Sequence, residues 1–119
     1  MEPIYDRNGL TVGWLKEDVI YNIDGTLCAF FRNGNIFNYE GDCLGRLDRG
    51  VFRDKDGDAV TFMREASEGP IPPVPEVAPV PPISAIPPIP PIPAVPPVPS
   101  ISSFNWSNIS LEEFLKGGF

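Results

Sequence analysis

A chain of 119 residues has room for one folded domain at most. Its 9 Lys and Arg are interspersed among 16 Asp and Glu, giving a formal net charge of −7, so no basic stripe exists to follow a phosphate backbone and nucleic acid is not expected as a partner. No apolar run approaches the roughly 20 residues that span a bilayer, and the N-terminus lacks a basic start followed by a hydrophobic stretch, so we expect a cytoplasmic protein with no membrane span.

Residues 4–67 consist of four ungapped 16-residue repeats, at 4–19, 20–35, 36–51 and 52–67. In every repeat the first position is Ile or Phe, the third is Asp or Asn, and the sixth is Gly. Each of these glycines follows Asn, Asp or Glu, a pair typical of the two central positions of a type I′ hairpin turn, where Gly supplies positive φ. The third-position side chain can accept a hydrogen bond from the backbone ahead of it, as in an Asx turn. We therefore predict hairpin tips at four structural turns: Gly9, Gly25, Gly41 and Gly57.

A second chain reversal is expected after each hairpin, so turns recur about every eight residues. Short β-prone runs between such turns indicate an all-β meander, and the 16-residue period makes a pair of strands the repeating unit. A linear ribbon this short would leave two long edges unpaired. We therefore predict that residues 1–68 form four β-hairpins around a pseudo-fourfold axis. A domain this small is marginally stable alone, so docking of its own tail or oligomerisation is expected.

Two columns of the repeat are mostly aromatic. Repeated rings could form a ligand face, but a domain this small also needs them for its core, which is the alternative we favour. Arg53 and Arg46 replace the aromatic residue at positions two and eleven, so whatever these columns pack or bind is not fourfold equivalent. Position ten holds only small residues, which allow another backbone or a symmetry neighbour to approach closely. The candidate ligand face is Tyr5, Tyr21 and Phe37; the eleventh-position rings are Trp14, Phe30 and Phe62; the small residues are Gly13, Ala29, Gly45 and Thr61.

The sequence favours neither a metal site nor catalysis. The segment 54–58 has alternating aspartates, but its glycine comes fourth where a calcium loop requires it sixth, and the aligned segments of the other repeats are hairpin tips. The chain has no His, and Cys28 and Cys43 have neither CxxC spacing nor a base nearby in sequence. Adjacent repeat positions put the two cysteines on opposite strand faces, which argues against a disulfide. We therefore expect no enzyme activity and no cofactor.

Residues 69–100 form a proline-rich linker, since 15 of the 16 prolines lie between Pro70 and Pro99. Proline fixes φ and lacks an amide donor, so the sequence predicts an extended polyproline II arm of roughly 90 Å. PxxP spacing is present, but SH3-type ligands also need a flanking basic residue, and no Lys or Arg occurs between Arg64 and Lys116. A stiff spacer is therefore favoured over a docking ligand.

Residues 101–119 form an aromatic C-terminal tip. Ser110 and Glu113 have the spacing of a capping box, which predicts a short helix over 111–116 that ends at Gly117. A helix of under two turns is not stable alone in water. It must therefore dock, either on its own β-domain, on another copy or on a different protein. The candidate partner-binding residues are Trp106, Leu111, Phe114 and Leu115.

An Ile-Tyr-Asp-x-Asn-Gly type motif at a 16-residue period, followed by a proline-rich stretch and a Trp-Ser-x-x-Ser ending, resembles bacterial proteins of the 4-fold beta flower family. The resemblance covers residues 4–67 directly, and it implies four β-hairpin petals about a central axis and no assigned activity. We expect a non-catalytic protein-binding or self-assembly module that presents an anchor peptide on a proline-rich arm, with a protein or another copy of itself as the partner. The alternative is a small-ligand or glycan-binding β-domain that uses the aromatic columns, including an accessory role in a bacterial toxin or phage system.

Overall fold

The computed structural model describes residues 1–67, 70, 75–77, 79, 81 and 102–116. Most of the proline-rich segment lies outside these residues, and with it the predicted polyproline II arm. The elements are β1 (Glu2–Tyr5), β2 (Thr11–Lys16), β3 (Val19–Asn22), β4 (Cys28–Arg32), β5 (Asn35–Phe37), β6 (Cys43–Asp48), β7 (Val51–Arg53), β8 (Ala59–Phe62) and α1 (Leu111–Leu115).

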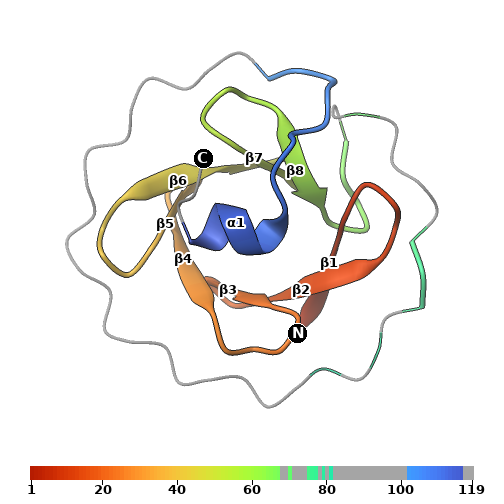
Figure 1. Cartoon of the computed structure of the whole chain (residues 1–119), viewed down its shortest axis with the longest axis horizontal. Coiled ribbons are helices and arrows are strands. Elements are labelled where there is room, and N and C mark those ends of the chain that lie inside the picture. Colours follow the sequence, from red (N-terminus) through yellow and green to blue (C-terminus); the bar gives the residue numbers. More distant parts are fainter. Residues whose placement is uncertain (68–69, 71–74, 78, 80, 82–101, 117–119) are drawn as a thin grey trace.

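The eight strands form one closed antiparallel barrel in which strands adjacent in sequence are paired. β1 closes the ring by pairing with β8, where Tyr5 lies opposite Phe62. Closure leaves no unpaired sheet edge, and Figure 1 shows the hairpin loops projecting outward around the ring. The predicted all-β fold of four hairpins around an axis is confirmed. In the described part of the chain, no helix is long and apolar enough to cross a membrane.

The hairpin tips differ from the predicted turn type. At the first tip the N–H of Gly9 donates to the carbonyl of Asp6 at 3.0 Å, so Gly9 is the fourth residue of the turn and not a central one. Gly9 has φ 80°, whereas Asn8 is not among the residues with positive φ. The type I′ prediction is therefore wrong for these tips, which fit a type I turn closed by a left-handed glycine. The same bond pattern and a positive φ recur at Gly25, Gly41 and Gly57.

The third-position side chains hold the tips together. Oδ1 of Asp6 accepts from the N–H of Asn8 at 2.9 Å and from the N–H of Leu10 at 3.0 Å. An Asx turn of this kind needs only the side-chain oxygen that Asp and Asn share. Asn38 and Asp54 accept the N–H groups two and four residues ahead in the same way. Asn22 also accepts two backbone N–H groups, but those of Thr26 and Leu27, four and five residues ahead.

At the other end of the barrel, two-residue turns join β4 to β5 and β6 to β7. Asn33 and Gly34 have φ 52° and 85°, and Arg49 and Gly50 have φ 51° and 81°. Positive φ at both positions is the signature of a type I′ turn, whose twist matches that of the flanking strands. The barrel thus has a tip end, where Gly9, Gly25, Gly41 and Gly57 lie, and a turn end, where these two-residue turns lie.

The barrel interior is filled by first-position side chains and by α1. Ile4, Ile20, Ile36 and Phe52 are fully buried in one cluster with the apolar side chains of α1. Figure 1 shows α1 in the middle of the ring. The tenth-position residues lie opposite the first-position ones and leave room for it: a Cβ on Gly13 would lie 2.4 Å from Leu111 Cδ2, and one on Gly45 would lie 2.9 Å from Phe114 Cε1. The predicted close approach at these small residues is thus made by the helix and by neighbouring backbone.

Candidate functional site

The C-terminal tip begins its helix with the predicted capping box. Ser110, at φ −80° and ψ 167°, accepts the N–H of Glu113 through its Oγ at 3.2 Å. The Glu113 carboxylate in turn accepts the N–H of Ser110 at 3.2 Å. The helix ends at Leu115 with Lys116 as its C-cap, one residue earlier than predicted. These reciprocal bonds satisfy amide groups that a free helix end would leave without partners.

The apolar face of α1 is buried in the barrel of its own chain. Leu111 is 3% exposed, Phe114 0% and Leu115 2%. Phe114 packs on the backbone of Gly45, and the Nδ2 of Asn22 donates to Glu112 Oε1 at 3.3 Å. Three of the four candidate partner-binding residues are therefore not exposed to a partner in this structure.

The fourth candidate, Trp106, lies in the segment that leads into α1. We call residues 102–110 the strap. Trp106 is half-buried, with its ring centroid 6.1 Å from that of Phe62 and 6.0 Å from the Arg7 guanidinium. It forms a parallel bridge with Ala59, whose N–H donates to the carbonyl of Asn105 at 3.0 Å. The strap therefore lies along the start of β8 before the chain enters the barrel.

Polar side chains of the fourth repeat hold the strap in place. Ser107 Oγ donates to Asp54 Oδ2 at 2.6 Å, and Ser103 Oγ donates to Asp58 Oδ1 at 2.6 Å. Arg53 donates through Nη1 to the carbonyl of Ser103 at 2.8 Å and to that of Gly57 at 2.7 Å. Two hydroxyl–carboxylate bonds and one guanidinium–carbonyl bond therefore bind the strap to this repeat, and charge-assisted hydrogen bonds of this kind are the strong ones.

These contacts explain why arginine replaces an aromatic residue in two columns. Arg53 is 1% exposed, and burial lowers the pKa of its guanidinium while the nearby Asp48 carboxylate raises it. Arg46 lies opposite Arg53 on β6 and donates to Ser102 Oγ at 2.8 Å. The departure from fourfold symmetry that the sequence shows therefore marks where the chain's own C-terminal segment docks.

The candidate ligand face is not open. Tyr5 is 0% exposed, and Tyr21 and Phe37 are each 2% exposed. Their rings pack on the eleventh-position rings: the centroids are 5.5 Å apart for Tyr5 and Phe62, and 5.4 Å apart for Phe30 and Phe37. The aromatic columns therefore serve as packing, and they provide no exposed platform for a glycan.

Neither metal binding nor disulfide formation is indicated in the described residues. Among them, no group of His, Cys, Asp and Glu is arranged to hold a metal ion. Cys28 and Cys43 are both free thiols. Burial raises the pKa of each thiol, so both are less ionised than an exposed cysteine at the same pH.

Comparison with known protein families gives a match over nearly the whole chain. The family model described as "4-fold beta flower protein" matches residues 2–115, a span that includes the barrel, the strap and α1. Neither the comparison with curated proteins nor that with solved structures gave a match. The helix that fills the barrel thus lies within the region that the family model covers.

Proposed function

The chain belongs to the 4-fold beta flower family, and we propose that it is a non-catalytic protein-binding module that presents its proline-rich segment as a loop fastened to the barrel on both sides. The observation that carries this proposal is the burial of Leu111, Phe114 and Leu115 inside the chain's own barrel. Because these side chains are occupied, a partner would meet residues 70–99 and not the C-terminal helix.

Described contacts support the fastening on both sides of the segment. Before it, the N–H of Ser67 donates to the carbonyl of Arg49 at 3.0 Å. Within it, the N–H of Glu76 donates to the carbonyl of Gly9 at 3.0 Å, and Glu76 Oε1 accepts the N–H of Thr11 at 2.8 Å. After it, the strap is held by the fourth repeat. Repeats one and four are neighbours in the barrel because β1 pairs with β8.

Fastening a proline-rich loop at both sides favours recognition by a protein. A segment with fewer conformations loses less entropy when it binds, and proline lowers that loss further by restricting φ. The Ile and Val residues between the prolines offer apolar side chains to a groove. The expected partner is therefore a protein with an apolar or aromatic groove that needs no basic residue in its ligand.

The proposal is tested with three versions of the full chain. A protein that binds the intact chain is first identified. Its affinity is then measured by calorimetry for the intact chain, for a variant with the Ile residues of 83–92 changed to Ser, and for Trp106→Ala. The Ile variant should lose binding. Trp106→Ala should weaken it because the strap side is loosened. A partner that binds the Ile variant as tightly as the intact chain would place the binding site elsewhere and contradict the proposal.

Self-assembly is the second candidate function. The barrel of a second copy would offer the strap and α1 the same polar and apolar contacts as their own barrel does, so exchange of the C-terminal segment between copies needs no new interface. Light scattering on the full chain, beside a truncation that ends at Glu68, separates the two candidates. A monomer in both, with the truncation less stable to heat, supports docking within one chain. A multimer in the full chain alone supports exchange.

A further inference from the structure

A cavity of about 570 Å³ lies at the turn end of the barrel. Its walls come from the start of β1, the end of β2, the turn between β6 and β7, and the residues that follow β8; the lining residues are Glu2, Pro3, Leu15, Gly50, Met63, Arg64 and Glu65. The side chains that hold the strap, Arg53, Asp54 and Asp58, do not line this cavity, so it is distinct from the strap site. Its volume is in the range of pockets that hold small organic ligands.

The cavity is preformed. The N–H of Met63 donates to the carbonyl of Gly50 at 2.7 Å, and the N–H of Ser67 donates to the carbonyl of Arg49 at 3.0 Å, which fixes one wall. Gly50 is held against Ala66, since a Cβ on it would lie 2.9 Å from the Ala66 Cα. Met63 is 8% exposed and belongs to the same core cluster as α1. The apolar side of the cavity therefore continues into the barrel core and has little freedom to collapse.

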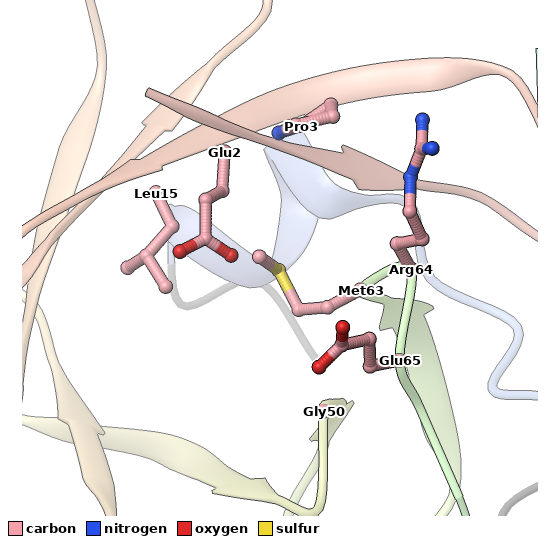
Figure 2. A pocket seen from close by; sticks show the side chains of 7 residues that line it. All are labelled: Glu2, Pro3, Leu15, Gly50, Met63, Arg64 and Glu65. Atoms are coloured by element: carbon pink, nitrogen blue, oxygen red, sulfur yellow. The ribbon is translucent and has the colours of Figure 1, made fainter.

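The polar groups around the cavity are mainly negative. Figure 2 shows the carboxylates of Glu2 and Glu65 extending toward the side where Leu15 and Met63 lie. Arg64 extends the other way, and its Nη2 donates to the Tyr5 hydroxyl at 3.3 Å. Within the described residues, neither carboxylate is engaged in a hydrogen bond or an ion pair. The overall net charge of −7 favours the approach of cations to these two carboxylates.

We propose that this cavity binds an aliphatic ammonium group, either that of a free alkylamine or that of a lysine side chain of another protein. The ammonium would donate hydrogen bonds to Glu2 and Glu65, and its methylene chain would pack on Leu15 and Met63. Charge-assisted hydrogen bonds give the site its preference for cations. The thioether of Met63 adapts readily to a flexible aliphatic chain. None of the residues that line the cavity belongs to the proline-rich segment, so the test does not depend on the function proposed above.

The test uses the full chain and three probes with the same six-carbon chain. NMR titration with n-hexylammonium should shift the amide signals of Leu15 and Met63, whereas hexanoate and hexanol should shift them little or not at all. Equal binding of hexanol would show that the carboxylates contribute nothing and would overturn the proposal. A fourth probe, lysine capped at both ends, identifies the source: binding at least as tight as that of n-hexylammonium indicates a protein side chain, and weaker binding indicates a free amine.

A matched pair of double variants separates the site from general charge effects. Glu2→Gln with Glu65→Gln should weaken n-hexylammonium binding by on the order of tenfold or more, since both charge-assisted bonds are lost. Asp24→Asn with Glu40→Gln removes the same charge from exposed tip residues that do not line the cavity, and it should leave the dissociation constant unchanged. All four residues are exposed, so both variants should fold. An equal loss in both variants would mean non-specific attraction and would refute the site.

Discussion

Replacing Phe114 by Ala tests whether α1 is part of the barrel core. The ring is 0% exposed and packs on the backbone of Gly45. Truncating a fully buried Phe to Ala typically lowers the free energy of unfolding by about 3–5 kcal/mol, because apolar contact is lost and a cavity remains. A small domain has only about 5–15 kcal/mol in total. Phe114→Ala should therefore remove a large part of the stability of the whole barrel, although Phe114 lies far outside the repeats in sequence.

The assay is urea unfolding followed by tryptophan fluorescence, since Trp14 is 1% exposed in the native barrel and should report its opening. Phe104→Ala is the matched control. Phe104 is in the strap but is 71% exposed, so the same substitution should change the free energy of unfolding by no more than about 0.5 kcal/mol. If the two variants unfold at the same urea concentration, α1 is not a core element and the reasoning fails.

Three further predictions follow from particular contacts. Gly45→Ala puts a Cβ 2.0 Å from the Arg53 carbonyl oxygen and 2.9 Å from Phe114, so it should lower the urea midpoint of unfolding. Gly34→Ala is the control and should lower it less, because Gly34 has φ 85° but nothing within 4 Å of the new Cβ. Similar midpoints would contradict the close approach of the helix. Ser107→Ala removes the 2.6 Å donor to Asp54 and should lower the free energy of unfolding by about 1–3 kcal/mol, measured by thermal melting, and an unchanged melting temperature would refute the role of this bond. Burial raises the pKa of Tyr39 to about 12, above the value of about 10 for an unfolded chain. The contribution of the neutral Tyr39 phenol to the stability of the fold should therefore be complete below about pH 10 and lost as the pH rises toward 12. Ultraviolet titration should show an ionisation near pH 12 that Tyr39→Phe abolishes.

Much of the barrel could be predicted from the repeat, because the columns that hold the same kind of residue in all four repeats have local physical causes. Glycine in the left-handed region and an Asx oxygen at the third position both act within a few residues, so the tips could be located. The turn type was wrong because the residue before Gly9 suggested a type I′ turn. The informative residue was Asp6, since Asp or Asn at the first position and Gly at the fourth favour type I.

The C-terminal site was only partly predictable. The capping box at Ser110 is local and could be read from the sequence, but the choice between the chain's own barrel and a partner depends on tertiary contacts. Two features of the sequence are explained by docking on the chain's own barrel: the small residues in the tenth column of the repeat, and Arg46 and Arg53 in columns that are otherwise aromatic. The cavity could not be predicted from the sequence, because Glu2 precedes the first repeat and the column of Glu65 holds residues as different as Asn33 and Arg49 in other repeats.

The central claim, that the helix fills the barrel of its own chain, is tested most directly by NMR contacts between Phe114 and Gly45. In a uniformly labelled sample, a nuclear Overhauser effect is expected between the Phe114 ring protons and the Gly45 Hα, since the ring lies against this glycine. In a sample that was unfolded and refolded as a mixture of labelled and unlabelled chains, an isotope-filtered experiment should show no such contact between chains. A strong contact between labelled and unlabelled chains would show that the helix docks in a neighbouring barrel and would contradict the account.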